Sequence, residues 1–268
     1  MKDKVVIITG ASSGIGKAIS EEFGSRGAKV VMAARNFEKL DQCRKELEKK
    51  NYNVFAIQAD VSKEEECKKL IDETVKKFGT IDILINNAGI SMRALFEDVD
   101  LNVIKRVMDV NFWGTVFCTK YALPYLLKNK GSIVGVSSIA GYKGLPGRTG
   151  YSASKFAIQG FLETLRIENL KKGLHVLIAC PGFTASNIRN TALAKDGSVQ
   201  GESPLDEAKL MTSEEVARRI VNAVVKRKHR IIMTTQGKLI VFLNKFFPKM
   251  MDRLVYNHMA KEPDSPFK

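Results

Sequence analysis

Short runs of apolar, mostly β-branched residues alternate along this chain with longer segments in which apolar residues recur at helical spacing. This alternation is typical of βαβ units, in which parallel strands form one sheet and helices cover both of its faces. Strands are expected at 4–9, 28–34, 53–58, 81–86, 132–136, 174–179 and 230–234. The pattern therefore predicts an α/β fold built on a doubly wound parallel sheet of about seven strands.

Two helix starts and one long connection stand out in this pattern. Ser62 and Thr212 are each followed three residues later by Glu, which is the spacing of a capping box. No repeat or Gly/Ser-rich linker interrupts the chain, so we expect one domain over residues 1–237 and a helical extension over residues 238–268. Residues 183–211 lack a periodic pattern, and so long a connection is expected to be a functional loop over the substrate.

A glycine-rich segment, Thr9-Gly10-Ala-Ser-Ser-Gly14-Ile-Gly16, follows the first expected strand directly. Glycines at such a place permit a tight turn, and they let backbone N–H groups approach a pyrophosphate at the positive end of the next helix. The alternative is a tight strand-to-helix turn that binds nothing. The strand before and the helix after are the context that a dinucleotide-binding motif requires, and they favour a Rossmann-type fold.

The spacing TGxxxGxG resembles that of the short-chain dehydrogenase/reductase family, and the likeness continues along most of the chain. Asn86-Asn87-Ala88-Gly89 follows the fourth strand, Asn111 lies in the next helix, and Ser137-Ser138 ends the fifth strand. Tyr151-Ser-Ala-Ser-Lys155 supplies a YxxxK pair, and Pro181-Gly182 follows the sixth strand. The resemblance implies an oxidoreductase that interconverts a ketone and a secondary alcohol with a nicotinamide cofactor.

The resemblance also implies a catalytic set of Asn111, Ser138, Tyr151 and Lys155. Tyr151 and Lys155 are four residues apart, so on a helix both face the same side. A phenol with a pKa of about 10 is a poor acid–base group near neutrality. We expect the ammonium of Lys155, with the positive nicotinamide, to lower that pKa. By resemblance, Ser138 holds the substrate oxygen, Lys155 also binds the nicotinamide ribose, and Asn111 holds a water of the proton relay.

The second strand ends in Ala33-Ala34-Arg35, without the carboxylate that would bind the ribose hydroxyls of NAD. Arg35 offers a guanidinium suited to a 2′-phosphate, although it could also begin a solvated helix. We therefore predict NADPH/NADP+ as the cofactor. By resemblance, Asp60 contacts the adenine, and Thr184 stands where the family usually has an apolar residue. The implied cofactor-binding residues are Gly10, Ser12, Ser13, Gly14, Ile15, Gly16, Arg35, Asp60, Val61, Asn87, Ala88, Gly89, Tyr151, Lys155, Pro181, Gly182, Thr184 and Ser186.

The substrate is less defined by the residues. Ile139, Leu145 and Phe183 lie near the expected site and favour an apolar ketone or alcohol over a sugar. The chain is similar to family members that act on steroids or long-chain lipid ketones, including 3-ketodihydrosphingosine reductases and 11β-hydroxysteroid dehydrogenases. A 3-oxoacyl-carrier-protein reductase and a non-catalytic NADPH-binding sensor or scaffold remain the alternatives. Further apolar residues either contact the substrate or pack the loop onto the core: Ala185, Ile188, Ala192, Leu193, Leu205 and Leu210.

Composition adds one unusual feature, a formal net charge of +14 on 268 residues, from 43 Lys and Arg against 29 Asp and Glu. Such an excess suggests nucleic acid, an anionic membrane or acidic ligands as partners. No nucleic-acid reader motif is present, so no nucleic-acid partner is expected. From Lys226 to the C-terminus, ten Lys and Arg face three acids.

Within that basic end, residues 238–261 mix apolar clusters with Lys and Arg. This segment could form an interfacial helix on anionic lipid, divided or kinked by Pro248. The alternative is a core or dimer-packing helix with a solvated basic face. The resemblance implies a homodimer or homotetramer, in which Phe112, Trp113, Phe156 and Phe161 either form an interface or fill the core.

The remaining signals concern compartment and metal. Four scattered cysteines without a CxxC pair fit a reducing cytosol. The N-terminal apolar run is too short for a signal peptide, and no stretch is long enough to span a membrane. We therefore expect a cytoplasmic protein, peripheral on a membrane if the tail binds lipid. His175, His229 and His258 are too dispersed to form a metal site, and no metal is expected.

Overall fold

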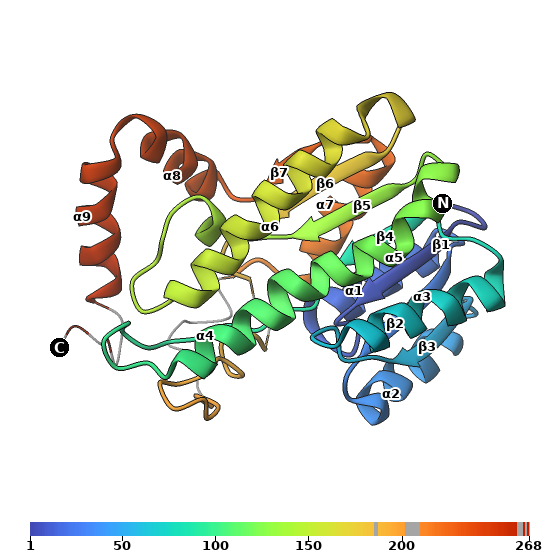
Figure 1. The fold of residues 1–268 in the computed structure, drawn as a ribbon, viewed down its shortest axis with the longest axis horizontal. Coiled ribbons are helices and arrows are strands. Elements are labelled where there is room, and N and C mark those ends of the chain that lie inside the picture. Colours follow the sequence, from blue (N-terminus) through green and yellow to red (C-terminus); the bar gives the residue numbers. More distant parts are fainter. Residues whose placement is uncertain (185–186, 202–209, 262–264, 266, 268) are drawn as a thin grey trace.

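The computed structural model describes residues 1–184, 187–201, 210–261, 265 and 267. Its centre is a parallel sheet with the strand order β3-β2-β1-β4-β5-β6-β7 (Figure 1). The strands are β1 (Val5–Thr9), β2 (Lys29–Ala34), β3 (Val54–Gln58), β4 (Ile83–Asn86), β5 (Ser132–Val136), β6 (His175–Cys180) and β7 (Arg230–Ile232). The predicted seven-stranded, doubly wound α/β fold is confirmed.

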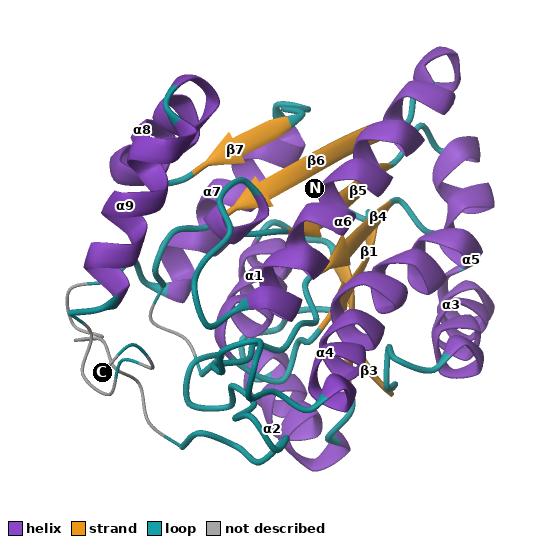
Figure 2. Ribbon diagram, turned by 60° about the vertical axis from the view of Figure 1, so that its left-hand side comes forward, coloured by secondary structure: helices purple, strands orange, loops and turns teal. Residues whose placement is uncertain are grey.

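Helices cover both faces of this sheet (Figure 2). On one face lie α1 (Gly14–Ser25), α2 (Phe37–Glu48) and α7 (Ser213–Val225); on the other lie α3 (Glu64–Phe78), α5 (Gly114–Lys128) and α6 (Thr149–Glu168). Successive strand side chains point to opposite faces, and β1 shows the division. Val6 and Ile8 pack with α1, α2 and α7, whereas Ile7 packs with α3, α5 and α6. Because both faces are buried, β1 is apolar from Val5 to Ile8, without alternation.

A smaller apolar cluster lies beside the carboxyl edge of the sheet. It joins α4 (Leu101–Met108) to the loop after β4 and to the long connection after β6, through Met92, Val103, Val107 and Leu193. The backbones of these loops are also bonded, since the N–H of Leu193 donates to the Ser91 carbonyl over 2.9 Å. Short helical turns complete the set: η1 (Asp109–Trp113), η2 (Ile139–Gly141) and η3 (Leu170–Lys172).

The long connection after β6 both packs against the body and lines a cleft, and contact of its apolar residues with the substrate stays a prediction. Ala192 and Leu193 are buried and pack the loop onto the body, whereas Ile188 lines a cleft described below. Leu210 is half-buried. Ala185 and Leu205 lie outside the described residues.

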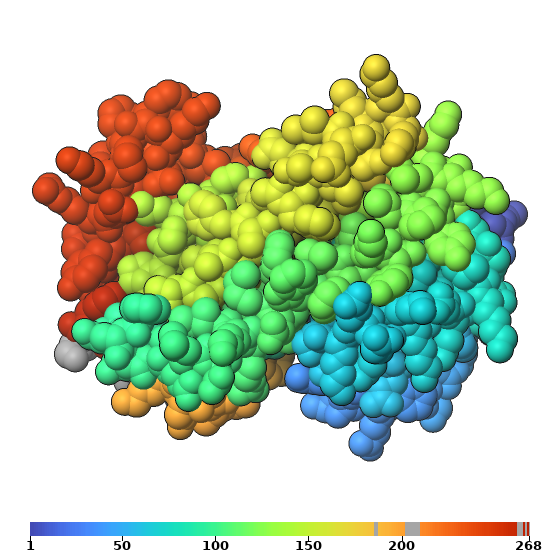
Figure 3. Space-filling view, viewed as in Figure 1, coloured from blue at the N-terminus to red at the C-terminus, as the bar shows by residue number. Residues whose placement is uncertain are grey.

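Two helices, α8 (Thr235–Phe246) and α9 (Pro248–Met259), form what we call the C-terminal helix pair, residues 235–259. The pair stands at one end of the molecule, coloured red in Figures 1 and 3. Pro248 is the first residue of α9 and confirms the predicted division, because proline is favoured at the first position of a helix. Among the described residues, no helix is long and apolar enough to cross a membrane.

One of the two predicted helix caps is wrong. Thr212 caps α7 as expected, its Oγ accepting from the Glu215 N–H over 3.2 Å. Ser62 does not cap α3, which begins at Glu64. Its hydroxyl instead donates to Asp60 Oδ1 over 2.7 Å, because a local turn around Asp60 takes the group that a cap would need.

Candidate active site

A cleft of about 760 Å³ opens at the carboxyl ends of the central strands. Strand β1 pairs with β2 on one side and with β4 on the other, so the chain leaves the sheet in opposite directions there. Such a reversal of strand order creates the crevice in which α/β sheets bind ligands. Every catalytic or cofactor-binding residue that was expected from the sequence and is described by the structure lines this cleft, except Asn111; Ile139, expected near the substrate, does not line it. Ser186 lies outside the described residues.

The glycine-rich segment forms a cradle at one end of the cleft. Gly10 has a φ of 66°, and a Cβ on Gly16 would lie 2.1 Å from the Gly10 carbonyl oxygen. Asn87 supports the turn, since its Nδ2 donates to the Thr9 carbonyl over 2.9 Å. Ser13 makes no side-chain cap at the start of α1, so the first N–H groups of that helix stay available to a phosphate. The cradle therefore fits a dinucleotide pyrophosphate.

Cations gather where β2 ends. Arg35 lines the cleft, as does Lys39, in the first turn of α2. Asn36 caps that helix, its Oδ1 accepting from the Lys39 N–H over 2.9 Å, and so holds the turn that carries both cations. Lys39 was not among the residues expected from the sequence, although it is a basic residue about one helical turn after Arg35. Asp60 also lines the cleft, with its Oδ1 occupied by the N–H and hydroxyl of Ser62.

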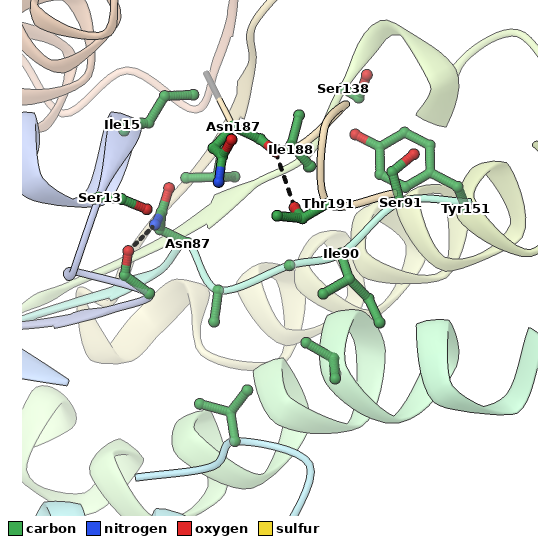
Figure 4. Close-up of a pocket in the computed structure, with 18 of the residues that line it drawn as sticks. Ser13, Ile15, Asn87, Ile90, Ser91, Ser138, Tyr151, Asn187, Ile188 and Thr191 are labelled. Carbon is green, nitrogen blue, oxygen red and sulfur yellow. Dashed lines mark hydrogen bonds between the residues drawn. The ribbon is translucent and has the colours of Figure 1, made fainter. Parts of the chain in front are cut away.

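Ser138, Tyr151 and Lys155 lie together at the other end of the cleft. Figure 4 shows the hydroxyls of Ser138 and Tyr151 near each other, with Ser13, Ile15 and Asn87 at the opposite end. Tyr151 and Lys155 share one face of α6, and the Lys155 Nζ lies 5.6 Å from the centre of the Tyr151 ring. Lys155 Nζ also donates to the Val136 carbonyl over 2.9 Å. Residues from β5 and α6 thus meet around a space where a carbonyl group could bind.

Burial has the largest effect on the pKa values of Tyr151 and Lys155. It raises the pKa of Tyr151, against the opposing effects of a hydrogen bond with Ser138 and the charges of Arg148 and Arg189. The expectation that Lys155 and the positive nicotinamide together lower the phenol pKa stays a prediction. Burial also lowers the pKa of Lys155 to about 8, because a buried ammonium loses its hydration.

Asn111 lies behind the cleft, in the π-helical turn η1. Its Oδ1 accepts from the Ile90 N–H over 2.8 Å, and its Nδ2 donates to the Ile90 carbonyl over 3.0 Å and to Ser154 Oγ over 2.9 Å. The side chain therefore ties the loop after β4 to the helix that carries Tyr151. The water contact implied by resemblance stays a prediction.

Two buried arginines at the reactive end were not anticipated. Arg148 Nη1 donates to the Met92 carbonyl over 3.3 Å, and Arg189 Nη2 donates to the Thr184 carbonyl over 2.8 Å. Both line the cleft, and the charge of each lowers the Tyr151 pKa. Neither carries a local signal, because Arg148 merely precedes α6 and Arg189 lies in an aperiodic loop. Thr184 is buried there, with its hydroxyl donating to the Gly182 carbonyl over 3.1 Å.

The histidines show no metal-binding arrangement within the described ranges. Groups of three or more His, Cys, Asp or Glu that could hold a metal ion are absent there. His175 instead contacts the Ser132 hydroxyl and the Lys228 carbonyl, each over 2.9 Å. That the protein uses no metal stays a prediction.

Comparison with known proteins supports this arrangement. The family model described as short chain dehydrogenase matches residues 4–197. The chain is 34% identical over 271 residues to 11-beta-hydroxysteroid dehydrogenase A of Sesamum indicum, covering 97% of this chain and 78% of the relative. It is 37% identical over 270 residues to the 11-beta-hydroxysteroid dehydrogenase of Pinus massoniana, covering 96% and 76%.

Two solved structures share the fold. A short chain dehydrogenase/reductase from Burkholderia phymatum in complex with NAD superposes with a TM-score of 0.82 and 26% identity, covering 93% of this chain and 95% of that one. An alcohol dehydrogenase from Thermococcus sibiricus complexed with 5-hydroxy-NADP gives a TM-score of 0.76 and 25% identity, covering 87% and 96%.

Proposed function

Since the chain belongs to the short chain dehydrogenase family, we propose that it is an NADP-dependent oxidoreductase that interconverts an apolar, lipid- or steroid-like ketone and its secondary alcohol. One observation carries the proposal: a single cleft holds a dinucleotide cradle at one end and Ser138, Tyr151 and Lys155 at the other. Residues 1–237 would bind the cofactor and carry the chemistry, with 183–211 over the substrate and 238–268 as an extension.

The reaction follows from the positions of the side chains. When bound, NADPH supplies the hydride that reduces the carbonyl carbon. Ser138 donates a hydrogen bond to the carbonyl oxygen, and Tyr151 transfers its phenolic proton to that oxygen. Lys155, fixed by the Val136 carbonyl, places its positive charge over the ring and stabilises the phenolate that remains. In the reverse direction, the phenolate takes the proton back from the alcohol.

The preference for NADPH rests on Arg35 and Lys39, which line the cleft together after β2. A guanidinium and an ammonium there would bind a 2′-phosphate, and β2 ends without a carboxylate to bind the ribose hydroxyls of NADH. We expect kcat/KM to favour NADPH over NADH by about tenfold or more, the effect of one good bond to a charged group. Arg35→Asp should reverse this preference, whereas Lys49→Gln, directly after the far end of α2, should leave it unchanged. Equal efficiency of the two cofactors in the native protein would contradict the assignment.

Apolar side chains favour an apolar substrate. Ile90, Leu145, Phe183, Ile188 and Leu193 all line the cleft. Relatives named as hydroxysteroid dehydrogenases are consistent with such a substrate. A series of ketones of increasing chain length and ring number, followed by NADPH oxidation, tests this assignment. Turnover should rise with apolar size.

The same assay separates the alternatives. Faster turnover of a 3-oxoacyl thioester on an acyl-carrier protein than of any free ketone would assign a carrier-protein reductase instead. NADPH binding without turnover of any substrate would assign a sensor or scaffold.

The C-terminal helix pair supports a membrane contact through residues 238–261. Each helix exposes an apolar stripe at i, i+3 and i+7, and basic residues flank both stripes. The first stripe is Leu239, Phe242 and Phe246 on α8, and the second is Phe247, directly before α9, with Met250 and Leu254 on α9; Lys238, Lys245, Lys249 and Arg253 lie beside them. Exposed aromatics beside lysines are typical of helices that lie at the surface of anionic lipid.

Co-sedimentation with phosphatidylserine-containing vesicles tests the contact. The full chain should bind these vesicles and not neutral ones, and Phe242→Ser with Phe246→Ser should reduce the bound fraction. The pair Lys120→Ser with Lys128→Ser, on α5, serves as the control. Equal binding of all variants to the vesicles would exclude the helix pair as the lipid-binding surface. Such an enzyme would lie on the cytoplasmic side of the membrane, where its four free buried thiols stay reduced.

An aromatic face suggests how two copies associate. Trp113 is 44% exposed and Phe156 is 46% exposed, while Phe112 and Phe161 are half-buried beneath them with their ring centres 6.2 Å apart. Large exposed aromatics are enriched at protein interfaces. We expect a homodimer or homotetramer, and Phe156→Glu should dissociate it in sedimentation velocity. A native protein that sediments as a monomer would contradict this proposal.

A further inference from the structure

The segment 139–148 connects the two halves of the proposed catalytic set. It begins just after Ser138, which lies two residues beyond the end of β5, forms η2, and leads into α6, which begins two residues before Tyr151. Leu145, at its middle, lines the cleft. Any displacement of this segment therefore changes both the wall of the substrate space and the spacing between Ser138 and Tyr151.

The C-terminal helix pair holds this segment at three points. Lys143 is only 8% exposed, and its ammonium forms an ion pair with the carboxylate of Asp252 on α9. Asn244 of α8 donates from Nδ2 to the Tyr142 carbonyl over 3.0 Å. A Cβ on Gly237 would lie 2.7 Å from Ile139 Cδ1, so α8 approaches the start of the segment closely. Figure 1 shows the loop between β5 and α6 reaching towards the two red helices.

These contacts act across a loosely packed junction. A second cavity, of about 480 Å³, lies between Lys143, Gly144 and Pro146 on one side and residues of α9 on the other. Beside this cavity, the Lys143–Asp252 ion pair and the Asn244–Tyr142 hydrogen bond are the polar links between the two parts. A buried ammonium that loses its partner is stabilised by moving towards water, so removing the Asp252 carboxylate would draw Lys143 outwards.

We propose that Asp252 and Asn244 are positioning residues for the substrate: they anchor segment 139–148 and thereby set the substrate end of the cleft from the C-terminal helix pair. The proposal rests on the oxidoreductase function proposed above. It gives the extension a role in the reaction that is independent of any membrane contact. The cofactor cradle lies at the far end of the cleft, so cofactor binding should not depend on this anchor.

Steady-state kinetics of the full-length protein test the anchor, with the best ketone from the series above and saturating NADPH. In Asp252→Ala and Asn244→Ala, we expect the KM for the ketone to rise about fivefold or more, because displacement of a positioning element weakens substrate binding. The KM for NADPH and the kcat should each change less than about twofold. Asp252→Glu should restore the native KM, and His258→Gln, an exposed change on the same helix, should have no effect. Unchanged ketone KM values, or an equal rise for NADPH, would overturn the proposal.

Hydrogen–deuterium exchange keeps this test separate from the proposed function. Amides of residues 139–148 should exchange faster in Asp252→Ala than in the native protein, while those of the cradle, residues 9–16, should not change. Unchanged exchange in 139–148 would refute the anchor even in an active enzyme. If the native protein reduces no ketone, the proposed function fails, and the exchange result alone decides whether the helix pair holds the segment.

Discussion

The buried ammonium of Lys155 should make the native protein less stable than it could be. Lys155 is 3% exposed, and burial lowers its pKa from 10.5 to about 8. That shift corresponds to about 3 kcal/mol of unfolding free energy, at 1.36 kcal/mol per pKa unit. Lys155→Met keeps the apolar stem but removes the donor to the Val136 carbonyl, which costs about 1–3 kcal/mol. We expect Lys155→Met to be inactive and about 1 kcal/mol more stable near neutral pH.

The pH dependence of the free energy of unfolding isolates the contribution of the Lys155 charge. Because the folded pKa lies below the unfolded one, the penalty is fully present below about pH 8. It is relieved as the pH rises from about 8 to 10.5, where the folded lysine has lost its proton and the unfolded one still holds it. The native protein should therefore gain up to about 3 kcal/mol relative to Lys155→Met across this range.

Urea unfolding without cofactor, at one protein concentration and at pH values of about 7 and 10, measures both quantities. Lys120→Met, at an exposed lysine of α5, is the matched control and should show no such pH-dependent difference. A stability difference between native protein and Lys155→Met that stays constant with pH would refute the reasoning. So would an advantage of the methionine variant that grows at high pH.

Three further predictions concern the cleft and its supports. Tyr151→Phe should reduce kcat by about a hundredfold or more by removing the proton donor, with an unchanged NADPH dissociation constant; retained turnover would exclude Tyr151 as the acid. Gly16→Ala should raise that dissociation constant about tenfold or more, because the new Cβ would lie 2.1 Å from the Gly10 carbonyl oxygen. Gly160→Ala, with nothing within 4 Å of its Cβ, is the control for calorimetric titration. Thr212→Ala should lower the free energy of unfolding by about 1 kcal/mol in urea titrations, through loss of the α7 cap.

The elements and much of the cleft were predictable because their signals are local. Buried parallel strands are continuous apolar runs, and the position of Pro248 divides α8 from α9 through the geometry of one residue. Gly10 and Gly16 occupy places where a Cβ would collide, so the motif marks the cradle directly. The Ser62 cap failed because Asp60 competes for the same hydroxyl, and the capping-box spacing does not include that neighbour.

The spacing of residues in the sequence could not predict whether the pKa of Tyr151 is raised or lowered. The i, i+4 pair correctly places Lys155 on the same face of α6, but the balance between attraction and desolvation depends on what covers the phenol. The same holds for Asn111, whose amide bonds to Ile90 and Ser154 from other parts of the chain. Helical spacing predicts which face of a helix a side chain occupies. How deeply that side chain is buried depends on the elements that pack over it in the assembled molecule.

The sequence by itself determined the fold class, the cradle and the order of the residues proposed for catalysis, since each depends on periodicity, turn chemistry or spacing within one element. Only the tertiary structure decided which distant charges reach the cleft. Arg148 and Arg189 come to Tyr151 from a helix start and an aperiodic loop, and Lys143 meets Asp252 across 109 residues of sequence. Contacts of this kind depend on how the layers pack around the sheet, and packing distances are not encoded in the local pattern of any one segment.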